Sequence, residues 1–329
     1  MELLTNSRLK SFRACQRMHH LRYDLGVRAV ADAETLAFGT AIHAALEAWW
    51  LAVQACAESP LAAALAALSI PDAFAAARAE VMVIAYDTRW LAWARRCEVL
   101  AVEAEFRLPL WNPSRTATSR TYELAGKMDV LIRLPEDEGR HITIVEHKTS
   151  SEDASPGSRY RARLTMDGQV SMYFDGADAL GYPAEACIYD VLGKPSIKPL
   201  KATPVEARKY TKDGRLYANQ READETVEEY RARLMEWAAE HHLDAMQHAE
   251  IVRLDGELDE HREDVWNLAT QMREGAAKGR APRNPDACER YGRLCELFPV
   301  CTGVASIDDP ALYQRGPAHP ELTPATEAA

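Results

Sequence analysis

Two neighbouring runs of apolar and β-branched residues constrain the fold of this chain more than any other feature. The first run occupies residues 126–133 and the second residues 142–149, and a short segment with Pro135 and Gly139 separates them. Runs of this kind, joined by a Pro- and Gly-containing loop, are typical of adjacent strands. The sequence therefore predicts a β-hairpin, and we take the rest of the chain to be organised around it.

The hairpin carries three charged residues that strand geometry can bring together. Because side chains alternate along a strand, Glu146 and Lys148 share one face, with Cα atoms about 6.5 Å apart. Asp129 can lie opposite them on the neighbouring strand. Two convergent carboxylates can hold a hard divalent cation, and an adjacent lysine can orient water or stabilise developing negative charge. These groups together suit the hydrolysis of a phosphodiester.

Length and composition are those of a soluble globular protein. The chain has 329 residues, of which 47% are hydrophobic and 27% charged, enough for one large domain or two small ones. No segment has about 18 uninterrupted apolar residues, and the first residues lack the apolar stretch of a secretory signal. We therefore expect a cytoplasmic protein with no membrane partner. In that compartment the seven cysteines are metal ligands, catalytic groups or buried thiols rather than disulfides.

The net charge of −11 argues on its own against a nucleic-acid partner. Positive charge is nevertheless concentrated in residues 1–28 and 194–221, and the second segment has eight Lys or Arg against Glu206 and Asp213. A locally basic surface can steer a polyanion into a groove of an acidic protein. Ordinary solvated charges are an equally good interpretation of each segment taken alone.

Helical periodicity and strand-like runs alternate along the rest of the chain. The predicted strands cover residues 98–110 and 186–192. The predicted helices are a short one capped by Ser7 that includes Cys15, residues 36–57, one or two in 61–96, one with Gln169, and residues 226–249 and 257–278. Residues 193–220 are a basic, proline-containing insertion, which we expect to be a loop or hairpin beside the groove.

Two pairs of polar residues lie on predicted helices at a spacing of four, which places each pair on one helical face. The pairs are His43 with Glu47 and Gln169 with Tyr173. A histidine in such a position can be a metal ligand. For an isolated pair, however, a satisfied histidine beside a surface glutamate is the commoner arrangement.

Three cysteines lie within fourteen residues near the end of the sequence. Cys288, Cys295 and Cys301 are separated by six and five residues, among aromatic residues and a proline. Three thiolates need a fourth ligand, and Cys15 is a candidate because the helix around it has no other explanation. Four cysteines suit either zinc or an iron–sulfur cluster, and the spacing, which differs from that of most zinc ribbons, favours iron–sulfur.

Taken together, these motifs resemble the PD-(D/E)XK nuclease superfamily. They resemble in particular its RecB-like branch with an iron–sulfur cluster, which includes the nuclease domain of AddB and the CRISPR adaptation nucleases. The matching motifs are Gly39 to His43, Gly126 to Asp129, Glu146-His147-Lys148, Gln169 with Tyr173, and the cysteines 15, 288, 295 and 301. Two features differ from that branch: Gln16 follows Cys15 where Pro is frequent, and the first late cysteine spacing is longer.

The resemblance implies an α/β fold in which helices flank a central mixed β-sheet, the restriction-endonuclease-like core. The resemblance also implies a helical N-terminal region and a C-terminal metal-cluster segment. Residues 1–305 would form a single nuclease domain closed by a cluster on the four cysteines, a 4Fe-4S cluster or alternatively zinc. Residues 306–329 are Pro-rich and polar, which predicts a disordered tail.

For the site, the resemblance implies Mg²⁺ or Mn²⁺ held by His43, Asp129 and Glu146, assisted by the carbonyl of His147. Lys148 would orient the nucleophile, and Gln169 and Tyr173 would help to position the substrate. The expected activity is that of a metal-dependent deoxyribonuclease, an exonuclease acting on single-stranded or frayed ends in recombination, repair or phage- and CRISPR-related DNA processing. A helicase or recombinase is the expected protein partner.

Two other classes of function remain open at this point. One is a non-catalytic DNA-binding or recombination scaffold that keeps the nuclease fold, and the other is a structural metalloprotein with surface carboxylates. The intact set of Asp129, Glu146, Lys148 and His43 favours catalysis, because a binding module has no use for all four.

Overall fold

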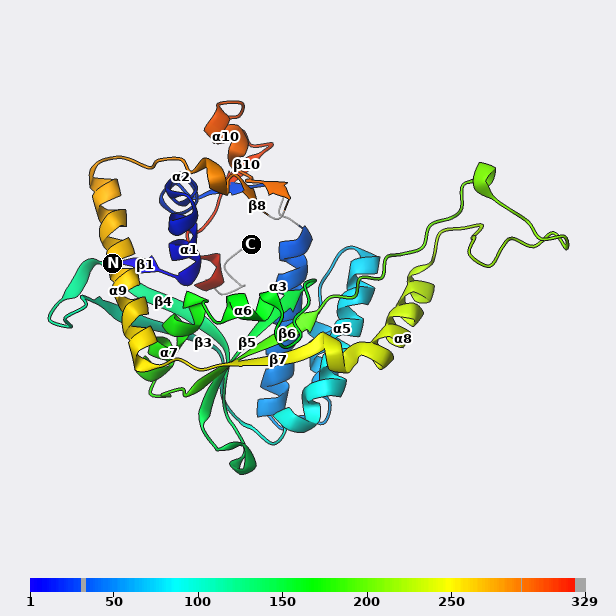
Figure 1. The fold of residues 1–329 in the computed structure, drawn as a ribbon, viewed down its shortest axis with the longest axis horizontal. Helices are drawn as coiled ribbons and strands as arrows, with labels where there is room; N and C mark the ends of the chain where they lie inside the picture. The colour runs from blue at the N-terminus through cyan, green and yellow to red at the C-terminus, as the bar shows by residue number, and fades with distance from the viewer. Residues whose placement is uncertain (31–33, 291, 323–329) are drawn as a thin grey trace.

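A six-stranded mixed sheet forms the centre of the protein (Figure 1). The computed structural model describes residues 1–30, 34–290 and 292–322. The strand order is β1-β4-β5-β6-β7, and β3 pairs with the free side of β4. β4 and β5 are antiparallel and β5 and β6 are parallel, so the predicted α/β mixed sheet is confirmed. The strands are β1 (Glu2–Leu4), β3 (Glu98–Trp111), β4 (Thr118–Arg133), β5 (Ile142–Ser150), β6 (Ala186–Gly193) and β7 (Met246–Ile251).

Helices cover both faces of this sheet, which explains why its central strands are apolar on both sides. One face packs against α3, α4, α5 and α8 around Trp49, Trp50 and Tyr86. The opposite face packs against α1, α7 and α9 around Met128, Ile144 and other apolar residues. The helices are α1 (Asn6–Ala14), α3 (Glu34–Gln54), α4 (Pro60–Ala67), α5 (Ala73–Ala94), α7 (Gly168–Ala179), α8 (Val227–Ala245) and α9 (Asp255–Ala277), with the short α2 (Gln16–His19), α6 (Arg159–Leu164) and α10 (Phe298–Thr302).

The predicted helix over residues 226–249 is wrong at its end. α8 stops at Ala245, and residues 246–251 form β7, which pairs with β6 from Cys187 to Leu192. The open edge of β6 supplies hydrogen-bond partners that a longer helix would leave unpaired, so tertiary pairing overrides the local helical preference.

The beginning of the chain also differs from the prediction in two details. Thr5, not Ser7, caps α1, because its hydroxyl accepts a hydrogen bond from the amide of Arg8 at 3.3 Å. Cys15 lies between α1 and α2 in an extended conformation rather than inside one helix. This break turns the Cys15 side chain out of the helical repeat.

Segments far apart in the sequence close on each other beside the sheet. β2 (Val27–Ala29) pairs with β10 (Tyr313–Arg315), and the side chain of Asn284 donates to the carbonyl of Ala14 at 2.8 Å. A small apolar cluster of Leu21, Val27, Leu297 and Tyr313 seals the junction. The prediction of a disordered tail from residue 306 is therefore wrong for β10, which finds its partner strand some 280 residues earlier. Residues 323–329 of that prediction lie outside the described residues.

A phenylalanine held between two glycines sets how closely α7 approaches the sheet. A Cβ at Gly126 on β4 would lie 2.6 Å from Cζ of Phe106, and one at Gly176 on α7 would lie 2.6 Å from other atoms of the same ring. Only glycine fits at both positions, so α7 can lie directly over β4. This brings the side chains of α7 within hydrogen-bonding distance of β4 and β5. None of the helices described here has the length and apolarity that crossing a bilayer requires.

Candidate functional site

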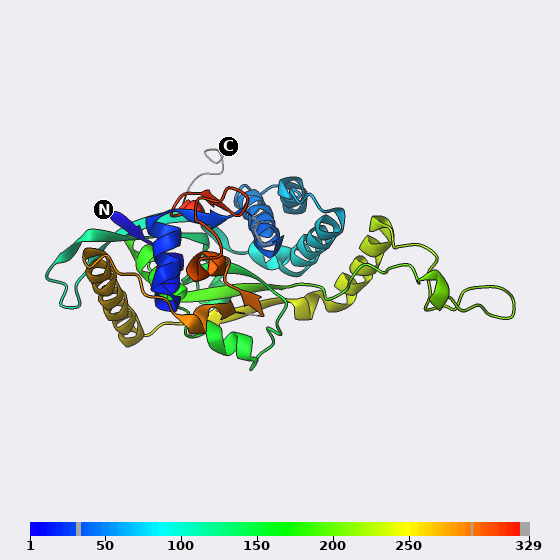
Figure 2. The same cartoon turned by 90° about the horizontal axis from the view of Figure 1, so that it is seen from above.

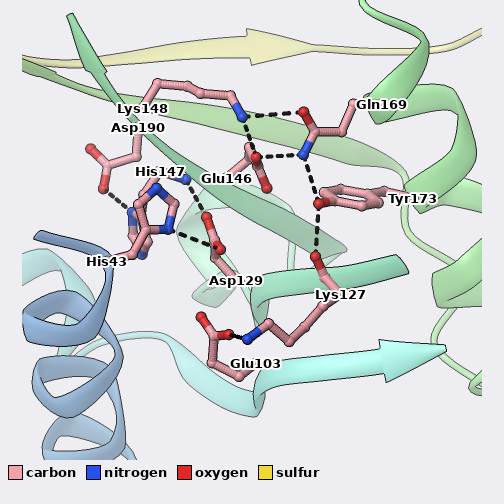
Figure 3. Close-up of polar contacts among 10 residues, drawn as sticks. All are labelled: His43, Glu103, Lys127, Asp129, Glu146, His147, Lys148, Gln169, Tyr173 and Asp190. Carbon is pink, nitrogen blue, oxygen red and sulfur yellow. Dashed lines mark hydrogen bonds and ion pairs between the residues drawn. The ribbon is translucent and has the colours of Figure 1, made fainter. Parts of the chain in front are cut away.

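Side chains from α3, β4 and β5 converge where the hairpin strands separate (Figure 3). The β4–β5 ladder ends at the pair Val130 and Val145, so Asp129 and Glu146 are the next residues on each strand. Beyond this point the amide of His147 donates to Oδ2 of Asp129 at 2.7 Å. The carboxylate thus replaces a missing ladder partner, which fixes Asp129 at the mouth of the opening.

Glu146 and Lys148 form an ion pair on the same face of β5, as their spacing predicts. The α7 side chain of Gln169 donates to Oε1 of Glu146 at 2.8 Å and accepts from Nζ of Lys148 at 3.2 Å. The same amide contacts the hydroxyl of Tyr173 at 2.7 Å, and that hydroxyl donates to the carbonyl of Lys127 at 2.7 Å. Gln169 and Tyr173 therefore brace the ion pair against β4.

Asp129 and His43 form a second charged pair. Nδ1 of His43, on α3, lies 3.4 Å from Oδ1 of Asp129. Burial alone would raise the pKa of the Asp129 carboxyl, but the interactions with His43 outweigh it and hold that pKa well below its usual range. Burial likewise opposes protonation of His43, yet Asp129 raises its pKa above the ordinary value. Each side chain therefore stabilises the charged form of the other.

Glu146 is the least compensated charge of the site. Only 2% of the residue is exposed, and its Oε2 has no hydrogen-bond partner among the described residues. Burial and the nearby charge of Asp129 raise its pKa to about 7, although Lys148 acts in the opposite direction. Without additional positive charge, this carboxyl is therefore only partly ionised at neutral pH.

Carboxylate oxygens like those of this site are the ligands that hard divalent cations prefer. Oδ1 of Asp129 and Oε2 of Glu146 are carboxylate oxygens without a strong hydrogen bond, and a cation between them would stabilise both ionised forms. In the arrangement described, Lys148 and His43 provide the positive charge instead. No three His, Cys, Asp or Glu side chains of the described chain are grouped as a metal ion requires.

The ring of His147 points to the face of β5 opposite Glu146 and Lys148, and its centroid lies 6.1 Å from that of the His43 ring. Nδ1 of His147 lies 2.9 Å from Oδ2 of Asp190, and Nε2 of His248 lies 3.4 Å from the other oxygen. These three residues are direct register neighbours on β5, β6 and β7. Asp190 is fully buried, and its two histidine partners outweigh the effect of burial and hold its pKa well below the usual range.

Sequence reasoning missed this row of His147, Asp190 and His248, of which the first two are buried. A signal was present, because Asp190 stands alone in the apolar run of residues 186–192. A charge inside a buried strand requires a partner. Here the partners come from both neighbouring strands, directly behind Glu146 and Lys148.

Glu103 is a third carboxylate beside the site, which the sequence analysis did not identify. It lies opposite Asp129 on β3, forms an ion pair with Lys127, and has a φ of 51° in the left-handed region. Burial raises its pKa, which Lys127 partly offsets. A strained backbone for a residue other than glycine is frequent near functional sites. Glu105, two residues further along β3, is exposed.

The four cysteines of the sequence motif line one cavity of about 190 Å³. Cys15 enters from the break between α1 and α2, Cys301 lies on α10, and the amide of Cys295 donates to the carbonyl of Cys288 at 2.7 Å. Burial raises the thiol pKa of Cys295 and of Cys301. All seven cysteines are free thiols, and the other three do not line this cavity.

The chain was compared with known proteins. No curated protein matches it. A solved structure described as the crystal structure of SSO0001 is 16% identical, with an alignment that covers 49% of this chain and a TM-score of 0.21. The match spans 56% of that protein, little more than half its length.

The family model of the PD-(D/E)XK nuclease superfamily matches residues 4–302. This range includes the hairpin with Asp129, Glu146 and Lys148, and all four cysteines of the cavity. The mixed sheet with its flanking helices is consistent with the restriction-endonuclease-like core of these nucleases. The chain therefore belongs to the PD-(D/E)XK nuclease superfamily.

Proposed function

We propose that this protein is a metal-dependent deoxyribonuclease of the RecB-like branch. One observation carries the proposal: Asp129 and Glu146 meet at the opening of the hairpin, next to Lys148, and Glu146 has a buried oxygen without a partner among the described residues. Such an arrangement destabilises the metal-free protein, and a divalent cation would relieve it. A scaffold protein has no reason to retain it.

In the proposed mechanism, His43, Asp129 and Glu146, with the carbonyl of His147, hold Mg²⁺ or Mn²⁺. When bound, the cation lowers the pKa of a water molecule and neutralises charge on the scissile phosphate. Lys148 orients the attacking water from the side of β5. Gln169 and Tyr173 keep Lys148 and Glu146 in place through the hydrogen bonds described above, and so position the reacting groups.

We also propose that Cys15, Cys288, Cys295 and Cys301 hold a 4Fe-4S cluster, with zinc as the alternative. Their shared cavity supports this, since four free thiols from three separate segments line it. Raised thiol pKa values indicate that the cavity disfavours isolated thiolates, so a metal centre would have to supply the compensating charge. The cluster would tie α1 and α2 to the segment after α9 and complete one nuclease domain over residues 1–305.

The substrate we propose is DNA, cut exonucleolytically at single-stranded or frayed ends. Recombination, repair or phage- and CRISPR-related DNA processing would supply such ends, together with a helicase or recombinase partner in the cytoplasm. A non-catalytic DNA-binding scaffold is the alternative function.

Incubation of the purified protein with labelled linear and circular DNA, in Mg²⁺, Mn²⁺ or chelator, tests the proposal. We expect metal-dependent loss of linear DNA. Asp129→Ala should abolish it, and Lys148→Ala should lower the rate by about 10²–10³-fold. Glu105→Ala, which removes an exposed carboxylate from β3, is the matched control and should keep full activity. Cutting at the wild-type rate by Lys148→Ala would contradict the assignment of the site.

A further inference from the structure

We propose that the arm formed by residues 194–226 binds single-stranded DNA outside the active site, an inference that rests on the proposed nuclease function. The arm leaves the sheet directly after β6 and returns into α8. In both views it projects away from the rest of the molecule (Figures 1 and 2). The loop between β3 and β4 projects at the opposite end.

The arm has a defined conformation without a hydrophobic core. Backbone bonds cross it from Thr203 to Arg221 and from Tyr217 to Lys209, and the side chain of Gln220 bridges its two halves. Yet no residue from 200 to 224 is buried. Ordering each residue costs about 1–2 kcal/mol of backbone entropy, which burial normally offsets. A protruding segment whose residues 200–224 include no buried side chain presents a surface to a partner instead.

The charge of the arm identifies the partner as a polyanion. Residues 194–226 have eight Lys or Arg against five acidic residues, three of which lie at the root in residues 222–225, in a chain with a net charge of −11. Lys201 is neutralised by Asp224, and Arg221 by Glu229. The exposed side chains of Lys209, Lys212 and Arg215, near the tip, have no carboxylate partner among the described residues.

Exposed tyrosines alternate with these cations, which favours single-stranded nucleic acid. Tyr210 is 52% exposed and Tyr217 is 46% exposed, on either side of the turn that carries Lys212 and Arg215. Unpaired bases stack on aromatic side chains while cations contact the phosphates, and base stacking contributes about 1–3 kcal/mol per base. Duplex DNA would offer only phosphates to this surface.

The root of the arm lies next to the proposed catalytic strand. The amide of Lys194 donates to the carbonyl of Ser150 at 2.7 Å, only two residues beyond Lys148. Lys148 itself is the register neighbour of Val191 on β6. A DNA strand that leaves the site past the ends of β5 and β6 therefore meets the arm first.

The test is a binding measurement with fluorescent single-stranded oligonucleotides of increasing length, using full-length protein made inactive by Glu146→Gln. In the parent protein we expect the affinity to rise with the length of the oligonucleotide. In a triple variant, Lys209→Gln with Lys212→Gln and Arg215→Gln, this rise should be lost. The variant's plot of log affinity against log salt should be shallower by about 2, since each lost phosphate contact removes about 0.7 for a single strand.

The matched control removes the same charge from the opposite end of the molecule. Arg107, Arg115 and Arg120 are exposed on the β3–β4 hairpin, and their replacement by Gln should leave both the length dependence and the slope unchanged. Tyr210→Ser with Tyr217→Ser should weaken binding to long single strands more than binding to duplexes.

Equal affinity of the arm variant and its parent for long DNA would overturn the inference. A change in oligomeric state instead of DNA affinity would also overturn it and assign the arm to a second copy of this acidic chain. Failure of the proposed function is a separate result: the otherwise unmodified protein would then cut no DNA in Mg²⁺ or Mn²⁺, whatever the arm binds. In active protein, the arm variant should cut short oligonucleotides at the unchanged rate.

Discussion

Replacing Glu146 by Gln should stabilise the metal-free protein while abolishing its activity. The side chain is nearly fully buried, with 3% exposed, so little solvent screening reduces its electrostatic cost. Burial and Asp129 raise its pKa from 4.5 to about 7. Glutamine has the shape of the protonated carboxyl, and it removes the charge that the site disfavours.

The expected change in the free energy of unfolding follows from this pKa shift. One pKa unit corresponds to about 1.4 kcal/mol, so the ionised carboxylate is about 3 kcal/mol less favourable in the folded than in the unfolded protein. Between the two pKa values the folded protein holds a proton that the unfolded chain has released. Stability of the wild type therefore falls as the pH rises through this window. Glu146→Gln should be more stable by about 3 kcal/mol at about pH 8 and by only about 1 kcal/mol at about pH 5.

Urea denaturation of protein freed of divalent cations, at both pH values, measures this difference. Glu105→Gln changes an exposed carboxylate on β3 and should stay within about 0.5 kcal/mol of the wild type at either pH. Saturating Mn²⁺ should stabilise the wild type and leave Glu146→Gln nearly unchanged. Equal stability of Glu146→Gln and the wild type at the higher pH would refute the reasoning.

Three further changes test other parts of the structure. His43→Ala should weaken Mn²⁺ binding about tenfold or more in titration calorimetry while the protein stays folded, because its ring lies 3.4 Å from Asp129; unchanged affinity would make His43 a packing residue. Cys15→Ala, purified without oxygen, should lose the brown colour, the solubility and the nuclease activity of the wild type together, whereas Cys56→Ala, at an exposed cysteine, should keep all three properties. A colourless wild-type protein with one zinc would support the alternative metal. Full metal content in Cys15→Ala would exclude Cys15 as a ligand. Asp190→Asn should destabilise the protein by about 3–5 kcal/mol in urea, since it leaves the buried His147 and the partly buried His248 without a carboxylate. Because the folded protein holds the pKa of Asp190 below its usual range, this difference from the wild type should shrink as the pH falls below about 4.

The parts of the fold that local sequence determines were predictable. β4 and β5 follow from β-branched runs, and the shared face of Glu146 and Lys148 follows from strand alternation alone. The convergence of Asp129 with Glu146 could be anticipated because one short loop joins their strands. The roles of these residues in catalysis stay predictions until activity is measured.

What sequence reasoning missed depends on pairings between distant segments. β7 begins where a helix could continue, and only the edge of β6 makes it a strand. His147 and Asp190 are 43 residues apart, and the register of β5 with β6 brings them together. β10 is a strand because β2 lies beside it. None of these partners can be identified from the residues of either segment alone.

The junction between the N-terminal and C-terminal segments also sets the order in which parts of a newly synthesised chain can fold. Ala14 and Asn284 are 270 residues apart, which at 5–20 residues per second corresponds to roughly 15–50 s of synthesis. During that time β4, β5 and β6 can already assemble with their helices, while Cys15 has no counterpart. The cysteine cavity therefore closes last among these parts. The metal that we propose for this cavity could therefore be bound by all four cysteines only after the chain has been synthesised past Cys301.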